Sequence, residues 1–177
     1  MDRELLLESP VASIRPPRLK PKPSKFLTWS ELDEIDFGRQ NKRIRFLALH
    51  GLRFGEAAAL TETDIYDGKV HVNKSKYGPT KSSAGNRTVP YLGYFDPFPK
   101  YQLTIADKLA PYGVTVHSLR KTYAYSLKTA NVHVTTASKL MGHSNPLVTM
   151  KIYTAVKDDE ITESGEALKK ALGLPQF

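Results

Sequence analysis

Four residues in the last third of the chain have types and spacings that could support nucleophilic chemistry. His117 and Arg120 lie in His117-Ser118-Leu119-Arg120, His143 follows a glycine, and Tyr153 comes ten residues later. A phenol is a poor nucleophile at neutral pH, because its pKa is about 10. A histidine could take the proton of Tyr153, and an arginine could hold an anion in front of it.

His117 and Arg120 are three residues apart, so on a helix they share one face. A guanidinium binds phosphate through two parallel hydrogen bonds, and an imidazole exchanges protons near neutral pH. A solvated helix face explains such a pair equally simply. His143 is expected at a helix junction, where a capping histidine is the alternative, and Tyr153 could be a core or surface tyrosine.

Two earlier segments offer further candidates. Arg53 lies in Gly51-Leu52-Arg53-Phe54-Gly55-Glu56, at a corner between two helices, and could point into a cleft with Glu56 as its support. A structural ion pair is the alternative. Lys81 lies on a predicted hairpin tip, where a lysine can reach a phosphate or donate a proton to a leaving alkoxide. Lys74 and Lys76 compete for this role, and a solvated loop lysine is the alternative.

The composition indicates the kind of partner. The chain has 26 Lys+Arg against 18 Asp+Glu, which gives a formal charge of +8 and favours a polyanion such as nucleic acid. It has no cysteine, and its five histidines form none of the spacings typical of metal sites. No apolar run is long enough for a membrane span. The sequence therefore favours a metal-free, cofactor-free mechanism in a reducing compartment.

The pattern of apolar residues, caps and turns predicts one mainly α domain with a small antiparallel β-sheet, an α+β class. Thr28-Trp29-Ser30-Glu31 is typical of a capping box, and Tyr66-Asp67-Gly68-Lys69 of a turn before a strand. Strands are expected at 70–72 and 87–91, joined by an exposed hairpin tip at 73–86. Helices are expected at 41–50, 56–60, 101–109, 117–129, 135–141, 146–153 and 159–172, with stops at Gly51, Asn131 and Gly142.

Residues 1–27 form a separate segment. The first 25 residues contain five prolines and six basic residues, which predicts an extended linker or arm, or alternatively a disordered tail. The globular domain is expected to cover residues 28–177.

The order of these motifs resembles the catalytic domain of the tyrosine recombinase family over residues 28–174. The motifs are Gly51–Glu56, the hairpin lysine, His117-Ser118-Leu119-Arg120, Leu140-Met141-Gly142-His143-Ser144 and Ile152-Tyr153. Phage integrases, those of actinobacterial phages among them, resemble it most. The resemblance implies the tyrosine recombinase catalytic-domain fold and a site-specific recombinase for phage DNA integration and excision.

The resemblance also implies roles for individual residues. Arg53 and Arg120 would clamp the scissile phosphate, and His143 would hydrogen-bond it.

Tyr153 would attack the phosphorus to form a 3′-phosphotyrosine. His117 would take its proton, and Lys81 would protonate the leaving 5′ oxygen. Residues expected to contact DNA are Lys74, Lys76, Arg87, Lys121 and Lys139.

The partners implied by the resemblance are double-stranded attachment-site DNA and three further copies, in a homotetramer that assembles on DNA from monomers. An accessory DNA-bending factor and action in the bacterial cytoplasm, at the nucleoid, are also implied. The expected helix at 159–172 would dock on a neighbouring protomer or pack on its own core.

Two departures from the family pattern are the absence of the usual N-terminal domains and a short interval between Pro90 and His117, where helices distal to the DNA are expected to be missing.

Two other functions are compatible with the same residues. One is a phosphotyrosine-type topoisomerase, which relaxes supercoils without site preference. The other is a DNA-binding module without catalysis.

Overall fold

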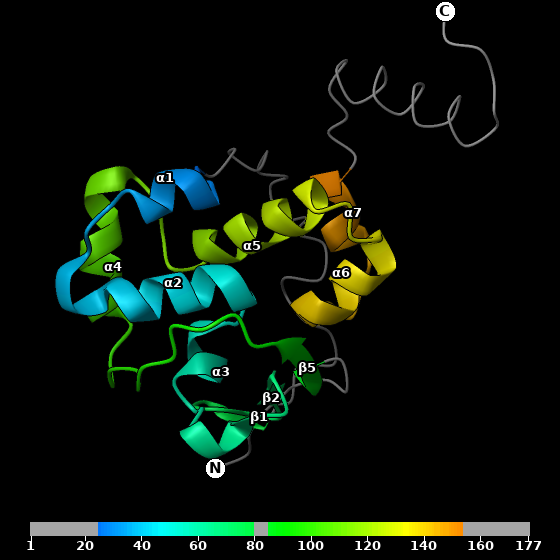
Figure 1. The fold of residues 1–177 in the computed structure, drawn as a ribbon, viewed down its shortest axis with the longest axis horizontal. Coiled ribbons are helices and arrows are strands. Elements are labelled where there is room, and N and C mark those ends of the chain that lie inside the picture. The colour runs from blue at the N-terminus through cyan, green and yellow to red at the C-terminus, as the bar shows by residue number, and fades with distance from the viewer. Residues whose placement is uncertain (1–24, 80–84, 154–177) are drawn as a thin grey trace, which may run out of the picture.

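The computed structural model describes residues 25–79 and 85–153. Helices α1, α2, α4 and α5 form one layer, the small sheet lies below it, and α6 and α7 close one end (Figure 1). The helices are α1 (Trp29–Asp33), α2 (Asn41–His50), α3 (Phe54–Ala57), α4 (Leu103–Leu109), α5 (Ser118–Thr129), α6 (Val134–Met141) and α7 (Leu147–Tyr153), with 3-10 turns η1 (Gly38–Gln40), η2 (Glu62–Asp64) and η4 (Ala110–Tyr112). The strands are β1 (Ile65–Tyr66), β2 (Lys69–Val72), β3 (Lys74–Ser75), β4 (Gly78–Pro79) and β5 (Arg87–Pro90).

The packing of α2 on α5 forms the centre of the helical layer (Figure 1). The helix α2 ends at Gly51, whose φ of 59° places it in the left-handed region, as the sequence predicted. A Cβ atom at Gly51 would lie 2.2 Å from Tyr123 Cδ1 of α5. Glycine therefore both stops α2 and allows α5 to approach the turn that follows it.

The predicted capping box at the start of the domain is confirmed. The Thr28 hydroxyl accepts a hydrogen bond from the Glu31 amide at 3.3 Å, and the Glu31 carboxylate accepts one from the Thr28 amide at 2.8 Å. The chain just before it also packs on the domain, because Phe26 contacts Tyr125 and the Thr122 hydroxyl donates to the Leu27 carbonyl.

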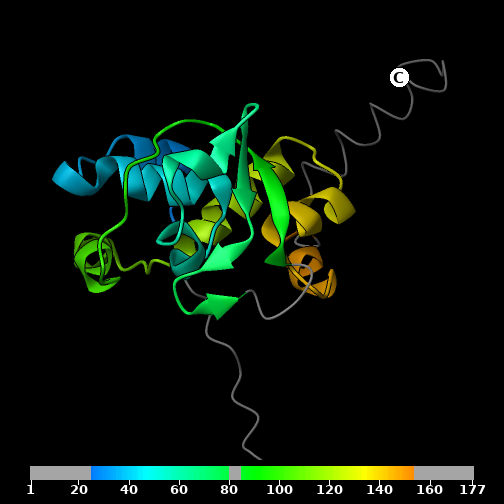
Figure 2. The same cartoon turned by 90° about the horizontal axis from the view of Figure 1, so that it is seen from below.

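The main sheet is antiparallel, in the order β1-β2-β5. Val70 pairs with Val89 in register, and both are buried, so alternate residues face the core. β5 is the edge that faces α6 and α7 (Figure 2). The segment predicted as an exposed tip at 73–86 begins instead with a second hairpin, β3–β4, which docks on α3 through a 2.8 Å hydrogen bond from the Lys76 amide to the Gly55 carbonyl.

Most helices lie within two residues of their predicted bounds, but α3 differs. It covers Phe54–Ala57 rather than 56–60, and it begins early because the Glu56 carboxylate accepts the Arg53 amide and caps an earlier turn. Asn131, predicted as a helix stop, has a positive φ of 53° just after α5. The predicted helix at 159–172 lies outside the described residues.

The short interval before α5 holds one helix, α4, and an aromatic loop. Phe95 and Phe98 of this loop contact Phe46 of α2. His50 fastens the start of the loop, because the Leu92 amide donates to its Nε2 at 2.9 Å. The Nδ1 proton then goes to the Phe46 carbonyl at 2.8 Å, so His50 is a neutral imidazole. Burial lowers the pKa of His50 to about 4, and the bond to Phe46 only partly opposes this.

In the described part of the chain, no helix is both long and apolar enough to cross a bilayer.

Candidate active site

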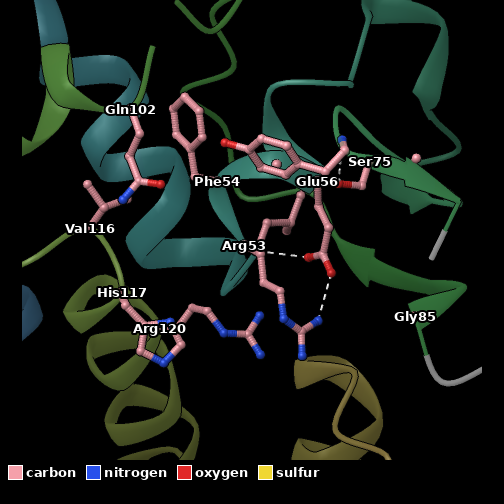
Figure 3. A pocket seen from close by; sticks show the side chains of 13 residues that line it. Arg53, Phe54, Glu56, Ser75, Gly85, Gln102, Val116, His117 and Arg120 are labelled. Carbon is pink, nitrogen blue, oxygen red and sulfur yellow. Dashed lines mark hydrogen bonds and ion pairs between the residues drawn. The ribbon is translucent and has the colours of Figure 1, made fainter. Parts of the chain in front are cut away.

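A pocket of 680 Å³ opens between α3, the β3–β4 hairpin and the start of α5 (Figure 3). Arg53, His117 and Arg120 lie on the same side of it, although they come from segments more than 60 residues apart in the sequence. The lining residues are Leu52, Arg53, Phe54, Gly55, Glu56, Ser75, Tyr77, Gly78, Gly85, Gln102, Val116, His117 and Arg120. The pocket thus combines three of the predicted catalytic residues with apolar and polar walls.

Arg53 is held in place by Glu56, as the sequence predicted. The Glu56 carboxylate accepts the Arg53 backbone amide at 2.9 Å and the Arg53 Nη1 at 2.8 Å. The Arg53 side chain is 48% exposed and that of Glu56 only 4%. A buried carboxylate therefore orients a guanidinium that remains open to the pocket.

A second arginine shares the same carboxylate. Arg87 Nη2 lies 2.9 Å from Glu56 Oε2, and Arg87 Nε donates to the Leu140 carbonyl at 2.8 Å. Burial alone would raise the pKa of Glu56, but the hydrogen bonds and charges of Arg87 and then the bonds from Arg53 lower it to about 2. Glu56 is therefore ionised at neutral pH.

The position of Arg87 differs from the predicted one. It was expected to contact DNA, but its side chain is only 5% exposed and is occupied by Glu56 and Leu140. It instead joins α3 to the end of α6. The turn that follows α6 also fits around it, since a Cβ at Gly142 would lie 2.7 Å from Arg87 Nη1.

Arg120 is the most buried cation of the pocket, at 3% exposure. Its Nη1 donates to the Gly51 carbonyl, and its Nη2 donates to the Met141 carbonyl at 2.8 Å. Its Nε is buried and has no hydrogen-bond partner among the described residues. Burial, and then repulsion by Arg53 and Arg87, lowers the pKa of Arg120 to about 9, so it is still a cation at neutral pH. Clustered guanidinium groups with donors that are not fully used are suited to an anion.

His117 occupies the N-cap position of α5 without a side-chain capping bond, and it lines the pocket one turn before Arg120. Burial and the charges of Arg120, Arg53 and Lys121 lower its pKa below the usual 6.5. At neutral pH the His117 imidazole is therefore mainly uncharged and able to accept a proton.

His143 joins the site through Arg120. It follows Gly142, which ends α6 in the left-handed conformation, with φ of 64°. Arg120 Nη2 lies 3.2 Å from His143 Nε2, and Thr149 Oγ1 lies 2.8 Å from Nδ1. Burial, followed by the charges of Arg120, Arg53, Arg87 and His117, lowers the pKa of His143 to about 4.

For Tyr153 the structure gives the position in the fold, and Lys81 is not among the described residues. Tyr153 is the last residue of α7, which packs on α5 and α6 (Figure 1). Lys81 lies outside the described residues, although Gly78 and Gly85, on either side of that segment, both line the pocket.

The lysines predicted to contact DNA differ in their partners and in their exposure to solvent. Lys74 is paired with Asp64 at 2.8 Å. Lys76 donates to the Lys100 carbonyl and lies within 5.8 Å of the ring centroids of Phe54, Tyr77 and Tyr101. Lys121 is half-buried on α5, and Lys139 is exposed on α6.

Sequence reasoning missed several residues of the site. Ser75, Tyr77 and Gln102 line the pocket, and nothing in their local sequence indicates it. Thr149 could have been found, because it lies four residues before Tyr153 on the same predicted helix. Among the residues that the structure describes, no three His, Cys, Asp or Glu side chains gather as possible metal ligands.

Comparison with known proteins finds similarity to integrases and recombinases. No family model matches it. The prophage integrase IntR of Escherichia coli (strain K12) is 35% identical over 82 residues, a match that covers 42% of this chain and 20% of the relative. The chain thus spans about one fifth of the length of this curated relative.

Solved structures share the architecture over most of the chain. The Tn1549 transposon integrase, in complex with circular intermediate DNA, matches with a TM-score of 0.66 at 19% identity, covering 84% of this chain and 68% of that one. The catalytic domain of bacteriophage HP1 integrase matches with a TM-score of 0.57 at 21% identity, covering 80% and 93%. The XerA recombinase matches with a TM-score of 0.56 at 19% identity, covering 92% and 68%. The chain therefore has the catalytic-domain fold of the tyrosine recombinases, as its sequence motifs predicted.

Proposed function

We propose that this chain is the DNA-cleaving and rejoining domain of a site-specific recombinase of the integrase type. The observation that most supports this is that Arg53 and Arg120 line one pocket, where the Arg120 Nε has no hydrogen-bond partner among the described residues. Two guanidinium groups, each held by protein acceptors, are suited to the non-bridging oxygens of a phosphodiester. An anion there would also relieve the mutual repulsion of Arg53, Arg87 and Arg120.

In the proposed reaction, the Tyr153 phenol oxygen attacks the scissile phosphorus. A bond forms between the tyrosine oxygen and phosphorus, and the bond from phosphorus to the 5′ oxygen breaks. The phenol proton passes to His117, which is neutral and can accept it, and Lys81 supplies a proton to the leaving 5′ oxygen. Attack by the 5′-hydroxyl of another strand reverses these steps and releases Tyr153.

The arginines contribute mainly to the transition state. Negative charge grows on the equatorial oxygens as the phosphorus becomes five-coordinate, and preformed donors stabilise it without reorganising. Arg120 is suited to this, because two backbone carbonyls already fix its plane. His143, bound to Arg120, would add a donor to the same phosphate.

The proposed substrate is duplex DNA that carries an attachment site, and the proposed setting is the bacterial cytoplasm. Two similar structures were solved with DNA: the Tn1549 transposon integrase with circular intermediate DNA, and the XerH recombinase with its difH substrate. The charge of +8 is appropriate for this partner. Assembly into a tetramer on DNA and help from a DNA-bending factor are part of the same proposal.

A nicked duplex that carries the attachment-site core tests the proposal. The nick lets the short fragment diffuse away after cleavage, so a covalent protein–DNA adduct accumulates. Wild-type protein should form the adduct and Tyr153→Phe should not. No adduct with wild-type protein, or an adduct with Tyr153→Phe, would reject the assignment. Relaxation of supercoiled plasmid lacking an attachment site would indicate the topoisomerase alternative, and salt-dependent binding without any adduct would indicate a binding module.

A further inference from the structure

We propose that Thr149 is a positioning residue, which hydrogen-bonds His143 Nδ1 and ties α7, the helix that ends in Tyr153, to the phosphate pocket. The proposal rests on the proposed function and adds a residue to it.

Thr149 is unusual among its neighbours on α7. Leu147, Val148 and Met150 are 59%, 50% and 45% exposed, whereas Thr149 is fully buried. The helix thus turns apolar side chains to its surface and a hydroxyl inward. That hydroxyl lies 2.8 Å from His143 Nδ1. A buried hydroxyl is tolerated where it is hydrogen-bonded, so this contact explains why a polar residue occupies the inward position.

The contact with Arg120 fixes the direction of these hydrogen bonds. A guanidinium can only donate, so His143 Nε2 must accept from Arg120 Nη2, 3.2 Å away. The proton of the neutral ring is then on Nδ1, and Thr149 Oγ1 accepts it. The chain of donors therefore runs from Arg120 through His143 to Thr149 in the DNA-free protein.

Phosphate binding requires the opposite arrangement. To donate to a phosphate oxygen, His143 must carry its proton on Nε2, and Nδ1 must then accept a hydrogen bond. A second proton on the ring is disfavoured by burial and then by the nearby charges of Arg120, Arg53 and Arg87. A hydroxyl meets both needs, because it can accept from Nδ1 in one state and donate to Nδ1 in the other. A backbone C=O in this place could only accept a hydrogen bond, and a backbone N–H could only donate one.

The same contact bears on the nucleophile. Thr149 and Tyr153 are four residues apart on α7, so one helical turn separates them. Holding Thr149 against His143 fixes the depth and rotation of this short helix relative to Arg120. Small errors in the position of a reacting group are costly to the rate, so the anchor should affect cleavage more than DNA binding.

The test compares Thr149→Val, which keeps the shape and removes the hydroxyl, with Thr149→Ser, which keeps the hydroxyl. Thr122→Val is the matched control. Thr122, on α5, is also fully buried, and its hydroxyl donates to the Leu27 carbonyl. The rate of adduct formation is measured in single turnover with saturating nicked DNA. Thr149→Val should slow adduct formation about tenfold, the equivalent of one hydrogen bond, and Thr149→Ser should restore most of the rate. Thr122→Val should lose comparable thermal stability without the loss of rate.

A spectroscopic measurement completes the test without depending on catalysis. In protein with ¹⁵N-labelled histidine, the His143 nitrogens should show a proton on Nδ1 in the free wild-type protein. Thr149→Val should shift the Nδ1 resonance, because Nδ1–H loses its hydrogen-bond acceptor, and Thr122→Val should leave that resonance unchanged. The inference is overturned if Thr149→Val has wild-type rate and an unchanged His143 spectrum, or if Thr149→Ser is as slow as Thr149→Val. If wild-type protein forms no adduct, the proposed function fails, but the spectra still decide whether Thr149 accepts the Nδ1 proton of His143.

Discussion

At the scale of single residues, the site is a cluster of cations that depends on one carboxylate. Glu56 neutralises part of the charge of Arg53 and Arg87, while Arg120 is surrounded by backbone carbonyls. This division leaves Arg53 exposed enough to move toward a ligand and holds Arg120 rigid. The two arginines should therefore differ in how substitutions affect stability and rate.

Arg53→Lys should reduce the rate of adduct formation by about 100-fold and leave folding nearly unchanged. Lysine keeps the charge but loses the planar pair of donors, and a lost transition-state donor has an effect of this size. Because the Arg53 side chain is 48% exposed, little buried structure depends on it. Single-turnover cleavage and thermal melting check the two parts. A rate within threefold of wild type would show that Arg53 does not hold the reacting phosphate.

His50 makes the stability of the domain depend on pH. Its folded-state pKa is about 4, against the usual 6.5, so between these values the unfolded chain takes up a proton that the folded chain refuses. The free energy of unfolding should therefore fall as the pH falls from 6.5 toward 4, by up to roughly 3 kcal/mol from this residue. Above pH 6.5 the contribution is fully present.

Urea unfolding at several pH values in wild-type protein and His50→Gln measures this effect. Glutamine does not titrate and can still accept from the Leu92 amide and donate to the Phe46 carbonyl. The variant should keep only the part of the acid sensitivity that other groups, such as His143, contribute. If the free energy of unfolding changes equally with pH in the two proteins, His50 is not the cause.

At the scale of elements, local signals predicted much of the fold. The capping box at Thr28 and the stops at Gly51 and Gly142 are set by neighbouring residues, so sequence alone located them. The DNA contact of Arg87 stays a prediction, but the alternation of β5 indicates on which side of the strand Arg87 lies. It is two residues from the buried Val89 and so lies on the same, inward side of the strand. The docking of β3–β4 on α3 depends on tertiary contacts that no local pattern encodes.

Gly51→Ala should destabilise the domain by about 2–5 kcal/mol, the sum of left-handed strain and a steric clash. The new Cβ would lie 2.2 Å from a ring carbon of Tyr123. Gly68→Ala separates the two causes, because Gly68 has a φ of 67° but no atom within 4 Å of such a Cβ. It should cost about 1–2 kcal/mol. Urea unfolding checks both values, and equal losses would mean that α5 can shift away from the turn at little cost.

At the scale of the whole molecule, sequence could predict the net charge but not its distribution. Of the cations expected to contact DNA, Arg87 is buried and Lys74 is paired with Asp64, whereas Lys139 is exposed on α6. The helix α6 lies at the end of the molecule where α7 and β5 meet, and α4 lies at the opposite end (Figure 1). DNA that reaches from the pocket to Tyr153 should run closer to α6 than to α4, because α7, which ends in Tyr153, packs on α6.

This arrangement predicts a difference in salt dependence between two charge-matched variants. Each phosphate contact adds about 0.9 to the slope of log affinity against log salt concentration, because binding releases condensed counterions. Lys139→Gln should lower the slope by about that amount, whereas Lys108→Gln on α4 should leave it unchanged although both remove one exposed positive charge. Binding of a labelled duplex across a roughly fourfold range of salt gives the slopes. Equal reductions would mean that the DNA responds to the overall charge of the protein, and a larger effect of Lys108→Gln would place the DNA on the α4 side.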